Sequence, residues 1–468
     1  MKQLRKSIRL CAAILAVIMV LPMLYGGYSL LRYGTRWRTS EYNTYLTGQK
    51  SGVIAGSIYD RAGVVLAYTD PGTGARVYPC DENTRRAMAH VIGNARGAVK
   101  NAVETFMAEY LYGANMTFFE RLEQTRQGAL RGDDVTLTLD SGLCARIGSL
   151  FPEGKSGAAV VMNYRTGELY AMCSFPNFDP AADGYPGVSL SLNRATRWLS
   201  APGSTFKIVT LAAALDSMPG VEDRTFLCTG GLTFGEHQRT VRDYGGTSHG
   251  DLSLRKAFAQ SCNSTFATLA GEMGDKALRR TAEAFGIGDD FTFRDLVVEN
   301  SAYAKSENEL LGADLAWTGA GQHQLSISPL HMCMIAAAVA NDGVMMEPRL
   351  LFSATTPAGK QRAGFESVAY RTALSRQTAQ TVRDYMREVV KSGTGTGARV
   401  KGLTICAKTG TAEIDTQKND NAWFVGFIES GGPPVAVCVV AADSGTGGKI
   451  AAPIAKQIFQ YVSESGRF

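Results

Sequence analysis

Ser204 and Lys207 stand three residues apart in the run Ala-Pro-Gly-Ser-Thr-Phe-Lys, and this pair could perform covalent catalysis. Pro202 and Gly203 precede an apolar stretch, residues 206–215, which predicts a helix that begins at the serine. Residues i and i+3 share one helix face, so the lysine amine can accept the serine proton if burial keeps that amine neutral. The pattern therefore indicates a serine nucleophile with a lysine base, beside free helix N–H groups that could stabilise an oxyanion.

A Ser-x-x-Lys pair by itself is weak evidence, because Ser253 and Lys256 form a second one and either pair could lie on a solvated helix surface. Two companions follow in order: Ser261-Cys262-Asn263, and Lys408-Thr409-Gly410 near the C-terminus. Together the three elements resemble the ordered set of penicillin-binding proteins and class A β-lactamases. Short copies of the second and third elements also occur at residues 191–193, 306–308, 155–157 and 391–393.

The chain as a whole resembles the class B penicillin-binding proteins, the single-span peptidoglycan transpeptidases. Residues 56–67 are similar to the segment that these proteins carry soon after the membrane, and residues 133–140 to the start of their transpeptidase domain. Further phrases in family order are Phe175-Pro176-Asn177-Phe178-Asp179-Pro180, Gly321-Gln322, Ala340-Asn341-Asp342-Gly343, Gly393-Thr394-Gly395-Thr396 and Trp423-Phe424-Val425-Gly426. The short N-terminal part resembles the compact penicillin-binding protein A type of this class.

The resemblance implies a role for each matching residue. Ser204 would attack the penultimate D-alanine carbonyl of a stem peptide ending in D-Ala-D-Ala and form an acyl-enzyme, with Lys207 as general base. Ser261 would pass a proton to the leaving amine, and positive potential from Lys408 would keep Lys207 neutral. The predicted substrate-binding residues are Asn263, Thr409, Gly410 and Thr411. The backbone N–H groups of Ser204 and Thr411 are the predicted oxyanion hole.

The implied function is a serine D,D-transpeptidase that crosslinks peptidoglycan and is inhibited by β-lactams. A D,D-carboxypeptidase would use water as acceptor, and no motif distinguishes that choice. A β-lactamase of the same fold would need an efficient deacylating base, but the sequence has no Glu-x-x-Leu-Asn arrangement, and Glu413 is interpreted as structural or as a distant substrate contact. A non-catalytic β-lactam sensor or scaffold would not need all three elements.

The segment Leu10–Leu31 is apolar and long enough to span a bilayer with some tilt. A short basic tail, residues 1–9, precedes it, so the prediction is a single-pass cell-membrane protein with a cytoplasmic N-terminus and an extracytoplasmic catalytic domain. A cleaved signal peptide would need a shorter apolar core and a small-x-small cleavage site, and no good site is evident. The resemblance implies a polytopic glycan polymerase of the shape, elongation, division and sporulation (SEDS) family as partner.

Composition argues against other classes of function. The net charge of +5 is dispersed, so no nucleic-acid partner is predicted. Nine cysteines could suggest disulfides, but the absence of Cys-x-x-Cys favours unpaired, buried thiols. Those in apolar stretches are Cys144, Cys173, Cys333, Cys406 and Cys438. The five histidines show no metal-ligand spacing, and His249 is interpreted as part of a turn, so neither a metal nor another cofactor is predicted.

These residues need a scaffold to position them. Strands are predicted at residues 158–163, 168–174, 404–413, 422–429 and 434–442, as a central antiparallel sheet with helices on both faces and a final helix at 452–462. Residues 254–340 predict a helical subdomain, and a cleft between it and the sheet would hold the site. The predicted fold is α/β (α+β): a transmembrane helix (10–31), a small pedestal (32–132) and a penicillin-binding/β-lactamase-like transpeptidase domain (133–468). The pedestal is expected to have strands near 52–59 and 64–68 and helices near 98–111 and 117–126.

Overall fold

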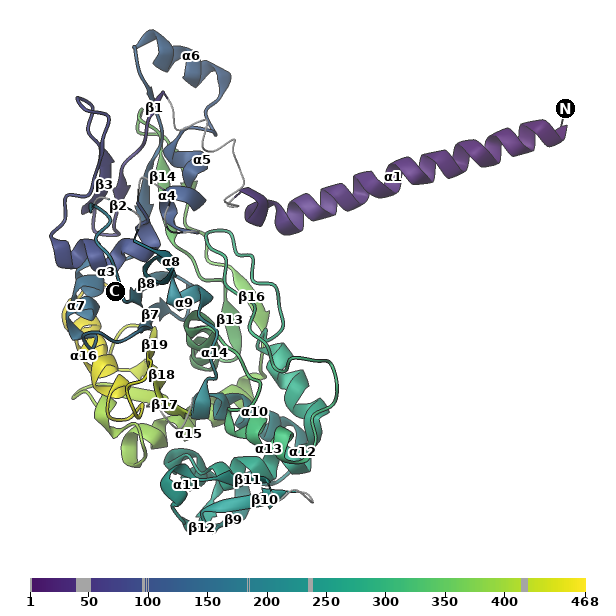
Figure 1. Cartoon of the computed structure of the whole chain (residues 1–468), viewed down its shortest axis with the longest axis vertical. Helices are drawn as coiled ribbons and strands as arrows, with labels where there is room; N and C mark the ends of the chain where they lie inside the picture. Colours follow the sequence, from purple (N-terminus) through teal and green to yellow (C-terminus); the bar gives the residue numbers. More distant parts are fainter. Residues whose placement is uncertain are drawn as a thin grey trace.

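The computed structural model describes residues 2–38, 52–94, 97, 99, 101–182, 184, 186–234, 239–413 and 420–468. One long N-terminal helix projects from an elongated body (Figure 1). The body carries a sheet rich in N-terminal strands at one end, a second sheet in the middle and a mainly helical part at the other end (Figure 1).

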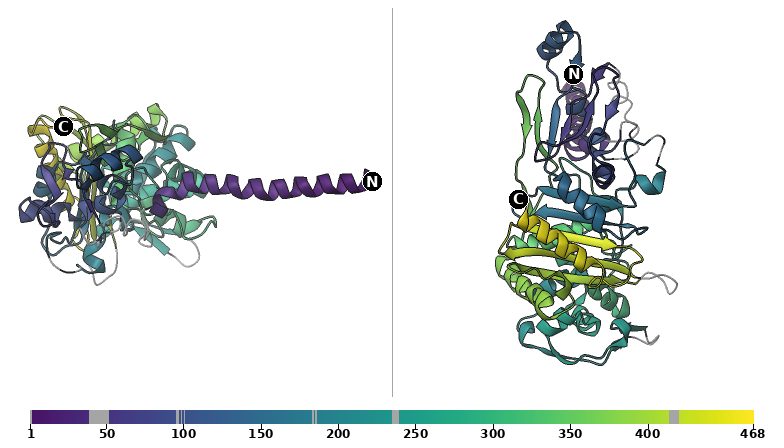
Figure 2. Two further views of the ribbon diagram at one scale, coloured as in Figure 1. Left: turned by 90° about the horizontal axis from the view of Figure 1, so that it is seen from above. Right: turned by 90° about the vertical axis from the view of Figure 1, so that its left-hand side faces the viewer.

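The central sheet has five antiparallel strands in the order β17-β18-β19-β7-β8. Its strands are β7 (Gly157–Asn163), β8 (Leu169–Phe175), β17 (Thr404–Ala412), β18 (Asn421–Ser430) and β19 (Val435–Ala441). Every residue of β7, β8 and β19 is buried, because α14 (Pro329–Ala340) packs on the sheet as well as α16 (Ala451–Glu464), which lies across its front in Figure 2. The predicted sheet and final helix are confirmed.

The helical part lies beyond the β17 edge of this sheet (Figure 1). It contains α10 (Lys207–Ser217), α11 (Leu254–Gln260), α12 (Asn263–Ala284), α13 (Gly312–Ala320) and α15 (Arg376–Ser392). Two small hairpin-like sheets border it: β9 (Thr225–Cys228) pairs with β12 (Gly250–Ser253), and β10 (Gly231–Phe234) pairs with β11 (Arg239–Arg242). Within the predicted range 254–340, α11, α12 and α13 belong to this helical part, whereas α14 packs on the central sheet instead. The four strands precede that range and were not predicted.

The N-terminal sheet has six strands in the order β15-β14-β6-β2-β3-β4. They are β2 (Ile58–Tyr59), β3 (Val65–Thr69), β4 (Arg76–Val77), β6 (Asp134–Leu137), β14 (Leu351–Thr355) and β15 (Gln361–Gly364). Strands from both sides of residue 133 therefore share one sheet, and the pedestal boundary at residues 132–133 stays a prediction. A parallel pair, β1 (Val53–Ile54) with β5 (Leu130–Arg131), lies outside this sheet.

The predicted pedestal strands are confirmed at β1, β2 and β3. Of the helix predicted near 98–111, only α4 (Val103–Phe106) and α5 (Ala108–Leu111) are helical, and residues 98 and 100 lie outside the described residues. The helix predicted near 117–126 is present as α6 (Phe118–Arg126), whereas α3 (Glu82–Ile92), capped by Asp81, was not expected. The remaining α-helices and strands of the described residues are α7 (Ser141–Leu150), α8 (Val188–Ser191), α9 (Arg194–Arg197), β13 (Val344–Met346) and β16 (Ala369–Thr372), the last two forming an antiparallel pair.

The N-terminal helix α1 runs from Lys2 to Arg38 and includes Pro22. Its portion Arg5–Leu30 is long and apolar enough to cross a membrane, and nearly all of its described side chains are exposed. This helix fits the predicted anchor. All nine cysteines are free: seven are buried in the folded body, Cys80 is partly buried, and Cys11 of α1 is exposed.

Candidate active site

Ser204 lies in a 3₁₀ turn, η1 (Gly203–Phe206), directly before α10 begins at Lys207. The sequence predicted that the serine would begin the α-helix, whereas the α-helix begins three residues later, and other segments approach this turn closely. Gly203 has a φ of +55°, and a Cβ on it would lie 2.7 Å from the Thr411 carbonyl oxygen. A Cβ on Gly321 would lie only 1.8 Å from the Gly203 oxygen. Two glycines thus let β17, η1 and the end of α13 meet at the serine.

Lys207 is completely buried and joins the serine to the loop across the cleft. Its Nζ lies 2.8 Å from Ser204 Oγ, 2.9 Å from the Ser261 carbonyl oxygen and 2.5 Å from Asn263 Oδ1. The last two oxygens can only accept hydrogen bonds, so a neutral amine donates both its hydrogens to them. Its lone pair is then left for the hydroxyl of Ser204, which is the arrangement a general base requires.

Burial lowers the pKa of Lys207 to about 7, although the negative potential of Cys262 and Asp243 acts in the opposite direction. A substantial fraction of the amine is therefore neutral at physiological pH. This is the condition under which the sequence pattern predicted proton acceptance from Ser204.

Ser261 lies between two lysines at the end of α11, with a left-handed φ of +63°. Its Oγ is 3.3 Å from Lys207 Nζ and accepts a hydrogen bond of 2.8 Å from Lys408 Nζ. Lys408, on β17, is also completely buried and donates to the Thr409 carbonyl oxygen at 3.0 Å. Burial, followed by the charge of Lys207, lowers the pKa of Lys408. Its surroundings therefore disfavour the permanent charge that the sequence-based interpretation assigned to it.

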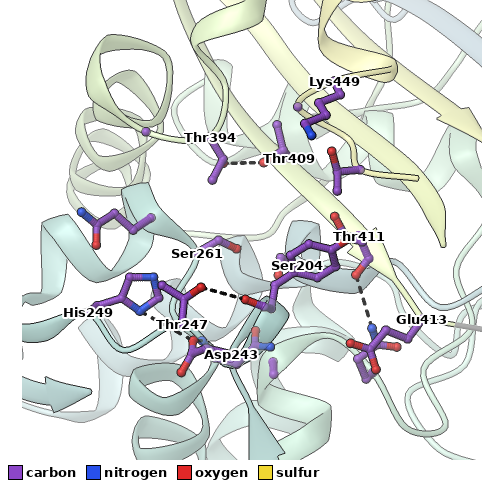
Figure 3. Close-up of a pocket in the computed structure, with 18 of the residues that line it drawn as sticks. Ser204, Asp243, Thr247, His249, Ser261, Thr394, Thr409, Thr411, Glu413 and Lys449 are labelled. Carbon is purple, nitrogen blue, oxygen red and sulfur yellow. Dashed lines mark hydrogen bonds and ion pairs between the residues drawn. The ribbon is translucent and has the colours of Figure 1, made fainter. Parts of the chain in front are cut away.

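A cavity of about 470 Å³ opens above these lysines. Five predicted site residues line it: Ser204, Ser261, Asn263, Thr409 and Thr411. Figure 3 shows Thr394, Thr409 and Lys449 on one side of Ser204, and Asp243 and His249 on the other. Lys207 and Lys408 lie outside the lining, beneath its floor. The Ser204 side chain thus borders the cavity, whereas both lysine amines are buried away from solvent.

Gly410 is the one predicted site residue that neither lines this cavity nor contacts the lysines in the part of the chain described. A Cβ at this position would lie 2.8 Å from the Pro202 carbonyl oxygen and 3.0 Å from both Thr205 Cγ2 and Trp423 Cβ. Packing of β17 against η1 therefore already requires glycine here. Its assignment to substrate binding stays a prediction.

Several cavity residues had no predicted role. Thr394 and Gln322 are two of them: the Thr394 hydroxyl shares a hydrogen bond of 2.5 Å with that of Thr409, and Gln322 Nε2 donates to the Thr411 carbonyl oxygen at 3.3 Å. Both Thr394 and Gln322 belong to phrases that resemble the family, which was a usable signal. Lys449, after β19, had none. Glu413 also lines the cavity, and burial and then the nearby Asp420 raise its pKa.

The second Ser-x-x-Lys pair has a structural explanation. Ser253 is the N-cap of α11, and its hydroxyl accepts from the Lys256 backbone N–H at 3.4 Å. Both residues are exposed. Capping satisfies a helix N–H group that would otherwise lack a partner, so this pair belongs to local helix structure.

A second polar cluster lies beside the Ser261 loop. Ligand-type atoms of Cys228, Asp243, His249 and Cys262 all lie within 4.8 Å of one another. The sequence predicted no metal because its histidines lack ligand spacing, yet these four side chains come from separate segments that only the fold brings together. Among the residues that the structure describes, these four form the group that could hold a metal ion.

Comparison with known proteins agrees with this geometry. Residues 157–460 match the penicillin binding protein transpeptidase domain, and the chain therefore belongs to that family. The peptidoglycan D,D-transpeptidase PbpA of Mycolicibacterium smegmatis is 33% identical over 327 residues, which are 64% of this chain and 65% of the relative. Stage V sporulation protein D of Bacillus subtilis is 31% identical over 351 residues, 70% of this chain and 53% of the relative. The match thus spans less than two thirds of each relative's length.

Solved structures cover more of the molecule. Penicillin-binding protein A from Mycobacterium tuberculosis, as a ceftriaxone acyl-enzyme complex, superposes with a TM-score of 0.80 at 29% identity, covering 88% of this chain and 99% of that one. The D,D-transpeptidase domain of a peptidoglycan glycosyltransferase from Eggerthella lenta gives 0.77 at 31% identity, covering 89% and 100%. The class B penicillin-binding protein fold is thereby shown for this chain.

Proposed function

We propose that this protein is a membrane-anchored serine D,D-transpeptidase that crosslinks peptidoglycan stem peptides and is inhibited by β-lactams. The observation that carries the proposal is the position of Lys207, whose buried amine faces the Ser204 hydroxyl while two acceptor oxygens hold its hydrogens. A relative is named a peptidoglycan D,D-transpeptidase, and a solved relative is an acyl-enzyme complex with ceftriaxone. Both names agree with an acyl-enzyme mechanism.

In the proposed acylation step, Ser204 Oγ attacks the penultimate D-alanine carbonyl of a donor stem peptide while Lys207 accepts the hydroxyl proton. The N–H groups of Ser204 and Thr411 stabilise the oxyanion. Ser261, within reach of both lysines, passes the proton to the amine of the departing D-alanine. The same path in reverse deprotonates an acceptor amine, which attacks the acyl-enzyme and frees Ser204.

Binding of the donor peptide is assigned to the cavity walls. Asn263 would contact the acyl chain, and the hydroxyls of Thr409 and Thr411 would bind the terminal carboxylate. That carboxylate would raise the pKa of Lys408 and so favour its charged form. Burial and the charge of Lys207 disfavour this form when no substrate is bound. Lys449, which lies on the same side of Ser204 as Thr409 (Figure 3), is a further cation within the same cavity.

A combined assay tests the proposed function. The full chain in detergent is incubated with a fluorescent penicillin, and separately with a donor stem peptide and an amine acceptor. Covalent labelling together with a crosslinked product is expected. Free D-alanine without crosslinked product would indicate a carboxypeptidase, rapid penicillin turnover a β-lactamase, and labelling without any peptide chemistry a sensor or scaffold.

The penicilloyl adduct on Ser204 is expected to outlast a normal catalytic turnover by far, because the described cavity offers no recognised base for hydrolysing it. Mass spectrometry of the intact protein after removal of free penicillin measures its lifetime. Glu413→Gln provides the control, since this is the carboxyl group in the cavity lining with a raised pKa, and the adduct lifetime should not change. Release within seconds in the parent chain would contradict the transpeptidase assignment.

Membrane topology and partner form the remaining part of the proposal. The basic N-terminal tail, residues 1–9, supports a cytoplasmic N-terminus and a cavity on the other side of the membrane. A SEDS-family glycan polymerase would supply nascent strands to this site, contacted through α1 and the predicted pedestal. Gly26 and Gly27 of α1 have no heavy atom within 4 Å of a Cβ built on them, so this thin stretch is free to pack closely against another helix.

Replacing residues 10–31 with an unrelated transmembrane span of equal length is expected to keep the protein in the membrane and to weaken co-purification with the polymerase. Membrane fractionation and affinity capture measure the two effects. A matched variant, Gly26→Leu with Gly27→Leu, keeps the native span and changes only its two glycines. Full capture by the foreign span would refute a helix-specific contact and leave the predicted pedestal around residues 52–68 as the candidate surface.

A further inference from the structure

The cluster of Cys228, Asp243, His249 and Cys262 lies at the base of the loop that carries Ser261. Cys228 ends β9, Asp243 follows β11, His249 precedes β12, and Cys262 caps the N-terminus of α12. Pairing of β9 with β12 puts Gly250 opposite Cys228, which brings His249 to the thiol. Four segments are therefore joined at one point.

The distances in this cluster suit a single metal ion. Cys228 Sγ lies 3.3 Å from Asp243 Oδ2 and 3.2 Å from His249 Nδ1, and His249 Nδ1 lies 4.0 Å from Asp243 Oδ1. Ligands that surround zinc tetrahedrally at 2.0–2.3 Å are about 3.3–3.8 Å from one another. All four ligand atoms here lie within 4.8 Å of one another, so small side-chain shifts would complete the tetrahedron.

Burial and chemistry narrow the choice of ion. Both cysteines are completely buried, Asp243 is 2% exposed and the His249 side chain 16% exposed. Two sulfur donors with an imidazole and a carboxylate suit zinc, whereas calcium and magnesium prefer oxygen ligands throughout. Four protein ligands leave no open position, which is typical of structural rather than catalytic zinc sites.

We propose that Cys228, Asp243, His249 and Cys262 bind one Zn²⁺ ion as a structural site that holds the Ser261 loop in place. On binding, the two thiols release their protons to solvent as two zinc–sulfur bonds form, and the imidazole and carboxylate each donate a lone pair. No oxidation or reduction takes place. This assignment replaces the sequence-based expectation that the protein holds no metal.

Neighbouring hydrogen bonds already orient the ligands. Asp243 Oδ1 accepts from the Asn263 backbone N–H at 2.5 Å, and Asp243 Oδ2 accepts from the Ser264 hydroxyl. Cys262 Sγ accepts from the Thr265 backbone N–H at 3.4 Å and from its hydroxyl at 3.2 Å. Such bonds fix ligand geometry and support a metal site. They also tie the site directly to the first turn of α12.

In the proposed transpeptidase, we expect the bound zinc to hold the Ser261 loop in its active position. Cys262 separates Ser261 from Asn263, and both of these contact Lys207. Ser261 has the left-handed conformation, which costs energy for a residue with a side chain. Only a small apolar group, Cys228, Leu252, Ala257 and Cys262, packs at this point, so a metal would supply the stability that the local core lacks.

Metal content tests the proposal independently of any peptide chemistry. The full chain is purified in detergent without chelator, saturated with zinc and desalted, and zinc is measured by elemental mass spectrometry. About one zinc per chain is expected. Cobalt substitution should also give a thiolate-to-cobalt absorption band. Cys80→Ser, which changes a partly buried thiol outside the cluster, should retain the full zinc content.

His249→Gln is expected to weaken zinc affinity by about tenfold or more, measured by competition with a chromophoric chelator. Wild-type protein that retains no zinc would overturn the proposal even if every variant misfolds. A Cys228–Cys262 disulfide in unreduced protein, or unchanged zinc affinity in His249→Gln, would overturn it too.

A final experiment tests whether zinc positions the Ser261 loop, and it rests on the proposed function. Zinc is removed from the full chain with a chelator below the unfolding temperature, and the rate of penicillin acylation is measured as zinc is restored. The rate should rise with zinc occupancy in wild-type protein and stay constant during the same titration of chelator-free Cys80→Ser. Bound zinc with an acylation rate independent of occupancy would refute the positioning role and leave the proposed transpeptidase function intact.

Discussion

Ser204→Ala is expected to abolish covalent labelling by a fluorescent penicillin, lowering the acylation rate by at least about 10⁴-fold. Only the hydroxyl is lost, and the residue lies in a 3₁₀ turn whose backbone conformation alanine adopts equally well. The thermal unfolding midpoint should therefore change little. Gel fluorescence and stopped-flow acylation measure the first effect, and a melting curve measures the second.

The chain offers a matched control for this variant. Ser253→Ala removes the hydroxyl of the second Ser-x-x-Lys pair, where the serine caps α11 at the surface. Its expected effect is a stability loss of about 1 kcal/mol with normal labelling. Persistent labelling of Ser204→Ala, or loss of labelling in Ser253→Ala, would show that the nucleophile has been misassigned.

Lys207→Met is expected to slow acylation by about 10³-fold or more, because it removes the base that faces Ser204. Methionine retains most of the buried stem, which limits the cavity left behind. Lys256→Met, at the exposed second pair, is the matched control and should acylate normally. Groups that act as one unit are strongly non-additive, so combining Lys207→Met with Ser204→Ala should cost no more than Ser204→Ala does.

The pH dependence of acylation provides a sharper test of this base. The pKa of Lys207 is lowered to about 7, mainly by burial, so the neutral, proton-accepting form predominates above that pH. Below it, the acylation rate of the parent chain should fall by about tenfold per pH unit as the amine becomes protonated. Burial opposes this protonation, whereas Cys262 and Asp243 favour it. A rate that stays constant between about pH 5 and 7 would contradict the assignment.

Local sequence was sufficient for most of the central sheet. The strands at residues 158–163 and 434–442 were predicted to within one or two residues of β7 and β19. Their short continuous runs of apolar residues are typical of strands that are buried on both faces of a sheet. The final helix was found for a similar reason, since α16 has a clear apolar face. In contrast, α3 was missed although Asp81 is a typical N-cap.

For the site, the sequence by itself determined the residue types and their order: a Ser-x-x-Lys, a Ser-x-Asn and a Lys-Thr-Gly element within a family-like chain. The Ser-x-x-Lys spacing alone could not distinguish Ser204 from Ser253, because both stand three residues before a lysine, and the family-like context led to the prediction of Ser204. The tertiary structure adds a physical difference between the two pairs: Lys207 is buried against Ser261, while Ser253 caps a surface helix. Proton affinity depends on burial and neighbours, which spacing does not encode.

The polar cluster beside the Ser261 loop shows more strongly that the sequence gives the residue types, whereas the fold determines which residues meet. Cys228, Asp243, His249 and Cys262 are spread over four segments and have no local metal-binding pattern. Pairing of β9 with β12 and the start of α12 bring them together. Side-chain type is a property of each residue, whereas convergence at one point depends on strand register and helix packing across the whole subdomain. The sequence therefore supplied the chemical groups, and only the folded chain decided which of them act together.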